Sequence, residues 1–143
     1  MLNDIEIKNY IKNHSLISEN YDEGCLTPNG YDLRVGEISD ENINRNQLFF
    51  ISSLEKLNLP DNVVASLYIK SKYSRRGIFS SFGFVDAGFK GNLTMAFYNF
   101  GDNIALENGC KFVQIVFYEI NMPEKNYEKR SGHYHNSNGI NLE

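Results

Sequence analysis

Residues 92–99 have the sequence Asn-Leu-Thr-Met-Ala-Phe-Tyr-Asn, in which every second residue from Leu93 to Phe97 is large and apolar. This period of two is typical of a β-strand that packs one face on a core. The run from Lys111 to Tyr118 is apolar nearly throughout, which suits a strand buried on both faces. Gln114 interrupts this run, and its amide needs partners from the protein or from a ligand.

Short apolar runs broken by turn residues continue on both sides of residues 92–99. From Leu48 onward the chain is rich in Phe, Tyr, Ile and Val, with Gly, Asn and Asp between the runs. Residues 3–14 favour a helix, because Asn3 and Glu6 have capping-box spacing at its start. The sequence therefore predicts a mostly β fold, a sandwich, jelly roll or barrel, with a short N-terminal helix within residues 1–16.

Length, cysteines and charge limit the classes of protein. A chain of 143 residues is enough for one core, so we expect a single domain over residues 1–143. Cys25 and Cys110 lack metal-ligand or disulfide-scaffold spacing, no apolar run approaches the roughly 20 residues of a membrane helix, and the N-terminus lacks signal-peptide character. We therefore expect a cytoplasmic protein that binds no membrane. A net charge of -4 disfavours polymeric nucleic acid but permits a small anion.

Positive charge is densest just after the strand-like run from Val63 to Ile69. Lys70, Lys72, Arg75 and Arg76 fall within seven positions there, and Ser71 lies among them. A triphosphate needs several donors at once, and Arg side chains and hydroxyls suit it. The alternative is a solvated basic loop.

A carboxylate stands between an apolar run and a glycine-rich turn in residues 83–91, Gly-Phe-Val-Asp-Ala-Gly-Phe-Lys-Gly. Asp86, held beside apolar side chains, could accept a proton from water, and the flanking glycines permit close approach of a ligand. The alternative is an Asp that stabilises its own turn through side-chain hydrogen bonds.

Two further pairs have candidate roles. Asp32 and Arg34 point to the same face of an extended segment, either to bind a ligand or to form a structural ion pair. His133 and His135 share one face of an extended tail, but the sequence offers no third metal ligand nearby.

Four stretches resemble, in order, the motifs of the family that joins dUTP diphosphatases and dCTP deaminases. They are Leu26 to Arg34 (Leu-Thr-Pro-Asn-Gly-Tyr-Asp-Leu-Arg), Lys70-Ser71 through Gly77, Val85 to Gly91, and Gly109 followed by Phe112 to Ile115. The resemblance implies a dUTPase-like distorted jelly roll or double-sheet β-barrel. It also implies a homotrimer in which the tail, residues 123–143, closes a site between subunits.

The resemblance also implies roles for individual residues. Asp86 would be the general base, Asp32 would hold Mg²⁺ through water, and Phe89 would stack on the sugar. The remaining substrate-binding residues would be Lys70, Ser71, Arg75, Gln114, Arg130 and Tyr134.

Position 96 bears on the reaction. In the deaminase branch a Glu after the third motif handles the protons of the attacking water, and Ala96 occupies that place here. A methyl group cannot move protons, so we predict a Mg²⁺-dependent dUTP diphosphatase that acts on a deoxynucleoside triphosphate. The alternatives are a dCTP deaminase, possibly dUMP-forming, and an inactive nucleotide-binding relative. The stretch from Gly77 to Asp86 is shorter than the usual family hairpin, which leaves base identity open.

Overall fold

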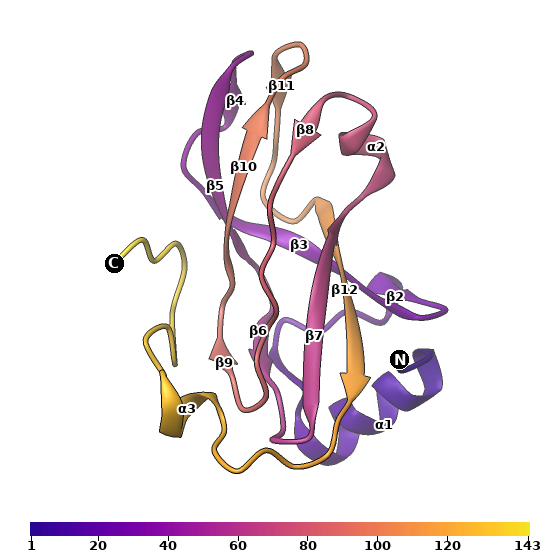
Figure 1. The fold of residues 1–143 in the computed structure, drawn as a ribbon. Helices are drawn as coiled ribbons and strands as arrows, with labels where there is room; N and C mark the ends of the chain where they lie inside the picture. Colours follow the sequence, from indigo (N-terminus) through magenta and orange to yellow (C-terminus); the bar gives the residue numbers. More distant parts are fainter.

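Antiparallel strands dominate the computed structural model, which describes all residues, 1–143 (Figure 1). The strands are β1 (Ile17–Glu19), β2 (Leu26–Thr27), β3 (Gly30–Ile38), β4 (Asn42–Ile43), β5 (Gln47–Ser53), β6 (Lys56–Asn58), β7 (Val63–Ile69), β8 (Ile78–Phe79), β9 (Lys90–Gly91), β10 (Thr94–Asn99), β11 (Ile104–Ala105) and β12 (Lys111–Glu119). The helical elements are α1 (Asp4–His14), η1 (Glu23–Cys25), α2 (Ser71–Ser74) and α3 (Tyr127–Arg130). The predicted mostly β fold with one N-terminal helix is confirmed.

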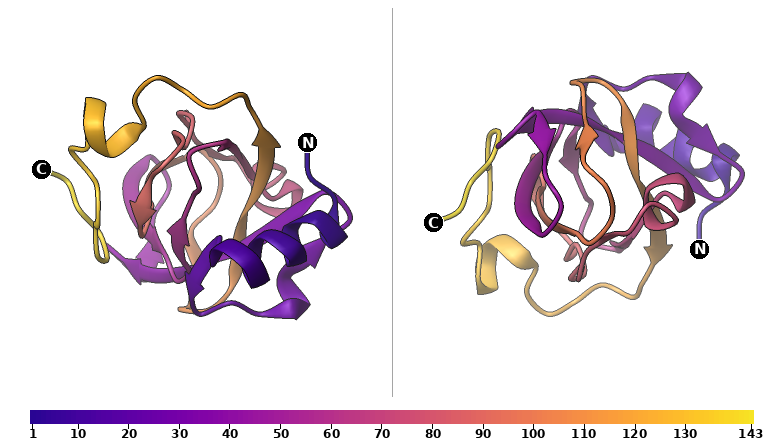
Figure 2. Two further views of the ribbon diagram at one scale, coloured as in Figure 1. Left: turned by 90° about the horizontal axis from the view of Figure 1, so that it is seen from below. Right: turned by 90° about the horizontal axis from the view of Figure 1, so that it is seen from above.

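The main sheet curls into a nearly closed barrel. Its strands follow the order β7-β12-β3-β5-β10-β8, and β2 pairs with β3. The chain beyond β8 then returns to the opposite edge, where Val85 bridges to Ala65 of β7. Viewed from below and from above, the strands surround a central space (Figure 2). The small sheet β1-β6-β9 lies at the lower end of the barrel in Figure 1.

Helix α1 lies across the outside of the barrel (Figure 2). It begins with the predicted capping box, in which Asn3 Oδ1 accepts from the Glu6 N–H and Glu6 Oε2 accepts from the Asn3 N–H. Ile7 is fully buried, and the Leu2 N–H donates to the Phe117 carbonyl at 2.8 Å. None of the helical elements has the length and apolar character of a membrane-spanning helix.

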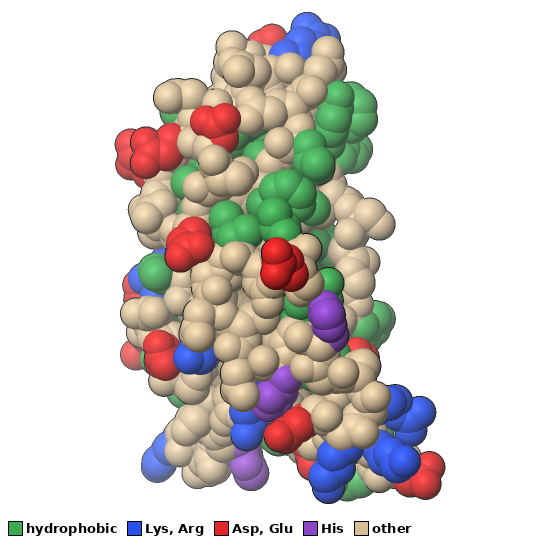
Figure 3. Space-filling view, turned by 90° about the vertical axis from the view of Figure 1, so that its left-hand side faces the viewer, with side chains coloured by type: hydrophobic (Ala, Val, Ile, Leu, Met, Phe, Trp, Pro, Cys, Tyr) green, Lys and Arg blue, Asp and Glu red, His purple; other side chains and the backbone are tan.

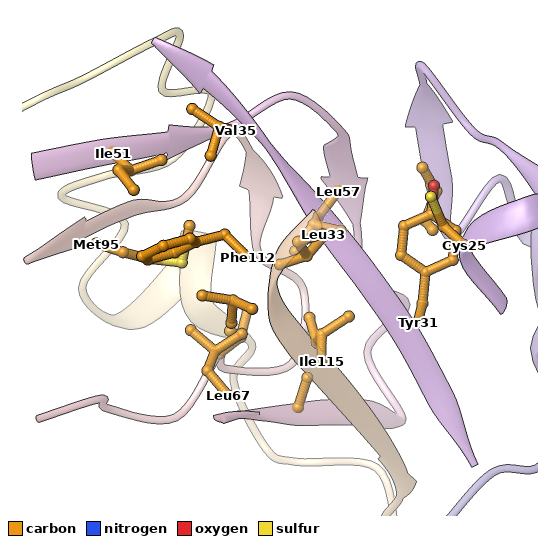
Figure 4. Packing of buried hydrophobic residues seen from close by; sticks show 14 of the residues in the cluster. Cys25, Tyr31, Leu33, Val35, Ile51, Leu57, Leu67, Met95, Phe112 and Ile115 are labelled. Carbon is orange, nitrogen blue, oxygen red and sulfur yellow. The ribbon is translucent and has the colours of Figure 1, made fainter. Parts of the chain in front are cut away.

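The core fills the barrel with aromatic and aliphatic side chains. Phe97 of β10 lies between Phe49 and Phe112, with ring centroids 5.3 and 4.9 Å away. Met95 and Phe97 are buried while Ala96 is exposed, so the alternation predicted for this strand is confirmed. Figure 4 shows Met95 and Phe112 among the core side chains.

Candidate functional site

A cavity of about 630 Å³ opens on the face of the barrel that carries the C-terminal tail. Figure 3 shows this face, with hydrophobic side chains gathered in its upper half. The cavity is lined by the segment after β8, the turn before β9, the start of β10, and the tail. Its apolar walls include Phe50, Leu67, Phe82, Phe84, Phe89, Leu93, Met95 and Ala96. Its size and lining are those of small-molecule sites.

The segment after β8 lines this cavity and carries backbone groups without partners in the chain. The backbone N–H and C=O groups of residues 81–84 form no hydrogen bond within the chain. Beside them, Ser80 Oγ donates to the Ala96 carbonyl at 2.6 Å, which holds this segment near the open edge of β10. Backbone groups need partners, so this segment is suited to the polar edge of a planar ligand.

Asp86 stands at the rim of the same cavity. Its carboxylate is exposed and accepts no hydrogen bond in the chain, whereas its carbonyl accepts from the Phe89 N–H at 3.1 Å to form the turn. The turn is therefore closed by the backbone, and the carboxylate is left free. Gly88, at φ +83°, takes the left-handed conformation that this turn requires.

Phe89 lines the cavity from the same turn. Its side chain is buried and packs edge-on against Tyr127, with ring centroids 5.6 Å apart. Ala96 lies in the wall, with its methyl group exposed to the space.

The tail covers one side of the cavity. His133 and Tyr134 line it, and so does the buried Ser137. The tail is held to its own barrel because the Asn136 N–H donates to the Lys90 carbonyl at 2.7 Å and the Asn92 N–H donates to the Ser137 carbonyl at 2.9 Å. Two other predicted candidates, Arg130 and His135, lie outside the cavity lining.

The first, second and fourth motifs meet elsewhere, on the outer face of β3, β12 and β7. Asp32 is buried, and its Oδ2 accepts from Lys70 Nζ at 2.5 Å. Gln114 pairs in register with Asp32, and its Nε2 donates to Thr27 Oγ1 at 2.9 Å. These contacts bring the predicted Asp32, Lys70 and Gln114 together.

Ser71 is the first residue of α2, and Arg75 directly follows this helix. Both residues are exposed and lie next to this cluster. They lie far from Asp86 in the same chain. Val85, the neighbour of Asp86, bridges to Ala65 of β7, and Ser71 follows Ala65 by six residues. At the rise of a β-strand, six residues span about 20 Å. Asp86 and Arg75 of the same chain are therefore too far apart to contact one small ligand.

Asp32 and Arg34 do not form an ion pair with each other. Arg34 Nε lies 2.7 Å from Oε1 of the fully buried Glu55, and its NH1 lies 3.4 Å from Asp22 Oδ2. Burial alone would lower the pKa of Arg34, but the hydrogen bond and charge of Glu55 outweigh it and raise that pKa. The alternative of an Asp32–Arg34 pair was wrong because each residue has a nearer partner on another strand or turn.

The side chains of one chain do not gather into a preformed metal site. No three His, Cys, Asp or Glu side chains form a group that could hold an ion. Asp32, to which the resemblance assigns Mg²⁺, is engaged with Lys70.

The sequence did not single out several cavity residues. Phe50, Tyr127 and Asn141 line the space without belonging to any motif. Alternation and turn residues indicate where strands begin and end, but not which turn a distant tail will cover.

The fold and the site define a β-barrel protein with a small-molecule cavity, a free carboxylate at its rim and a separate basic cluster. A family model described as dCTP deaminase-like matches residues 39–120. The chain is 37% identical over 136 residues to a dCTP deaminase of Pyrococcus horikoshii, covering 85% of this chain and 86% of that one. It is 28% identical over 156 aligned positions to a probable deoxyuridine 5'-triphosphate nucleotidohydrolase of Sulfolobus islandicus rod-shaped virus 1, covering 99% and 97%.

Solved structures agree in fold. The 2'-deoxycytidine 5'-triphosphate deaminase from Agrobacterium tumefaciens matches with a TM-score of 0.70 and 21% identity, over 81% of this chain and 47% of that one, so this chain spans about half of that protein. EIAV dUTPase matches with a TM-score of 0.55 and 26% identity, over 78% and 88%. The chain belongs to the dUTPase/dCTP deaminase family, as its motifs predicted.

Proposed function

We propose that this protein hydrolyses dUTP to dUMP and pyrophosphate. The observation that best supports this proposal is the free carboxylate of Asp86 at the rim of an apolar cavity of about 630 Å³. A carboxylate with no partner in its own chain is available to a water molecule beside a bound ligand.

The cavity suits a pyrimidine deoxynucleoside. The unpaired backbone groups of residues 81–84 would bind the polar edge of the base, since they supply both donors and acceptors. Phe89, fixed against Tyr127, would lie against the sugar. A 2′-hydroxyl pressed onto that ring would find no hydrogen-bond partner, which favours deoxyribose.

In the proposed reaction, Asp86 takes a proton from water as the water oxygen attacks the α-phosphorus. The bond between the α-phosphorus and the oxygen bridging to the β-phosphorus breaks, and pyrophosphate leaves with that electron pair. The proton stays first on the Asp86 carboxyl and then passes to solvent. Asp86 is exposed, so this proton can leave without crossing the core.

Ala96 supports hydrolysis over deamination. It presents a methyl group where the resemblance implies a proton-transferring Glu, and losing a general acid/base typically costs about 10²- to 10⁴-fold in rate. The names of the relatives favour a dCTP deaminase as the second candidate. That reaction would need another proton carrier, for which the cavity offers Asp86 and His133.

Mg²⁺ would enter with the triphosphate, whose charge it neutralises, because this ion is usually held by phosphates and water. We assign it no protein ligand, since Asp32 is held by Lys70.

A second copy of the chain would complete the site, in a homotrimer. Ser71 and Arg75 lie about 20 Å along the sheet from Asp86, so they would reach the phosphates bound by another subunit. Phe79 and Phe100 are each 55% exposed and pack edge-to-face beside β10. These aromatic rings provide an apolar surface for such an interface.

Pyrophosphate release with Mg²⁺ from dUTP, dCTP, dTTP and UTP tests the proposal. We expect release from dUTP, a loss of at least about a hundredfold in Asp86→Asn, and no change in Asp4→Asn, an exposed carboxylate at the start of α1 that lines neither cavity. Ammonia release from dCTP would instead identify a deaminase. Tight binding of an α,β-imido analogue of dUTP without turnover of any substrate would identify an inactive relative.

Mixing two variants tests the shared site. Asp86→Asn and Arg75→Ala should each be inactive, but subunits exchanged in a 1:1 mixture should recover about a quarter of the activity, since one site in four then combines both intact residues. Absence of recovery after verified exchange would place Arg75 outside the site.

A further inference from the structure

A second, smaller cavity adjoins the first at Asp86. Its volume is about 250 Å³, and Asp86, Tyr127 and Ser131 line both cavities. Because a water molecule occupies about 30 Å³ in the liquid, the space is roughly that of eight waters, enough for a diphosphate group with part of its hydration. The two cavities therefore form one path that passes the free carboxylate.

Two cations line the second cavity. They are Lys125, which precedes the N-cap of α3, and Arg130, which is the last residue of α3. Neither is among the ion pairs of the chain, which involve Lys8, Arg34, Lys56, Lys70 and His135 as the basic partners. Ser131, at the junction, adds a hydroxyl that makes no hydrogen bond in the chain.

The chain holds these cations beside the Asp86 turn. The Tyr127 N–H donates to the Ala87 carbonyl at 2.8 Å, one residue after Asp86. Asn126 is fixed at both ends of its amide, because Nδ2 donates to Asp61 Oδ1 at 2.9 Å and Oδ1 accepts from the Lys129 N–H at 3.0 Å. Lys125 and Arg130 flank this anchored segment, so their backbone positions are set relative to Asp86.

We propose that this second cavity is an anion subsite in which Lys125 and Arg130 bind the β- and γ-phosphates of the nucleotide whose nucleoside occupies the first cavity of the same chain. The inference rests on the proposed function for the position of the nucleoside. It adds Lys125 as a phosphate-binding residue and separates its role from that of Ser71 and Arg75, which would come from another subunit. Flexible ammonium and forked guanidinium groups are suited to phosphate oxygens.

Comparing the affinity for a triphosphate analogue with the affinity for the nucleoside isolates the contribution of the phosphates to binding. Lys125→Gln should weaken the α,β-imido analogue of dUTP about tenfold and leave deoxyuridine unchanged. Lys129→Gln is the matched control, because Lys129 is an exposed cation of α3 that lines neither cavity, and it should bind both ligands as the natural protein does. Arg130→Gln should behave like Lys125→Gln.

These measurements need no turnover, so they remain informative if dUTP hydrolysis is not found. An equal loss for deoxyuridine and the imido analogue would assign Lys125 a structural role and overturn the proposal. No loss for either ligand would overturn it too.

Subunit mixing checks that Lys125 acts on the site of its own chain. We expect Lys125→Gln to raise the KM for dUTP about tenfold. In mixed oligomers with Asp86→Asn subunits, only the Lys125→Gln chains keep Asp86. The KM should therefore stay raised, because every active site then has the substituted residue 125 of its own chain. A return of part of the activity to the natural KM would place Lys125 in another subunit's site and contradict binding within one chain.

Discussion

Lys70 Nζ lies 2.5 Å from Asp32 Oδ2, and this contact joins two residues that are 38 positions apart in the chain. The side chain of Asp32 is 8% exposed and that of Lys70 is 31% exposed, so the pair is shielded from solvent on the carboxylate side. It fixes the start of α2, where Ser71 lies, against β3.

A double-mutant cycle should show that this pair is coupled. Asp32→Asn and Lys70→Met should each destabilise the protein, and the double variant should lose less than the sum, with a coupling of about 1 to 3 kcal/mol. Urea unfolding of the four proteins gives this value. Additive losses would mean that the contact contributes nothing beyond its two separate side chains.

Tyr73 of α2 should make stability depend on pH in the alkaline range. It is buried against Phe112, with ring centroids 4.2 Å apart, and burial, together with a hydrogen bond to Cys110, raises the pKa of Tyr73 to about 12. Below pH 10 the folded and unfolded chains both keep the phenol proton. Between about pH 10 and 12 only the folded chain keeps it, so the free energy of unfolding should fall by about 2 to 3 kcal/mol.

Comparison with Tyr73→Phe isolates that contribution from those of the other tyrosines. The difference in free energy of unfolding between the two proteins should shrink or reverse as pH rises from about 9 to about 11.5 in urea titrations. A difference that stays constant would contradict the raised pKa.

Phe89 should control the discrimination between dUTP and UTP. Phe89→Leu keeps an apolar side chain but removes the ring that packs against Tyr127, so a 2′-hydroxyl would meet less apolar surface. We expect the ratio of kcat/KM for dUTP to that for UTP to fall about tenfold. Steady-state pyrophosphate release gives the ratio, and Tyr21→Leu, on a partly exposed ring outside both cavities, is the control for loss of an aromatic residue. An unchanged ratio would place sugar selection elsewhere.

Local patterns predicted the elements of the fold well. The alternation from Leu93 to Phe97 and the capping box at Asn3 each depend on only a few neighbouring residues, so β10 and α1 follow from the sequence. The run from Val63 to Ile69 likewise became β7.

Partners across the fold could not be predicted in the same way. Arg34 lies two positions from Asp32, yet its carboxylate partner is Glu55, which sits in no motif. The candidate site also depends on such long-range contacts. Asp86 follows from its glycine-rich turn and Phe89 from the family resemblance of that stretch, whereas the cavity around them depends on where residues 127–142 dock, which is set by tertiary contacts.

Gly91 should be needed for the docking of the tail. Its φ is +131°, and it bridges to Ser137, so a Cβ at position 91 would lie 2.7 Å from the Ser137 nitrogen and 2.8 Å from its carbonyl oxygen. Gly91→Ala should therefore push the tail off β9. Chymotrypsin should cut faster after Tyr134, and the KM for dUTP should rise, because His133 and Tyr134 would no longer line the cavity.

Gly109→Ala separates this effect from simple backbone strain. Gly109 has φ +82°, but a Cβ there would meet nothing within 4 Å. Both variants should lose about 1 to 2 kcal/mol of stability, since an L residue at positive φ is strained. Only Gly91→Ala should expose the tail. If both variants show equal proteolysis and an unchanged KM, the tail is held by its contacts with Glu37 and Thr94 rather than by the approach of Ser137 to Gly91.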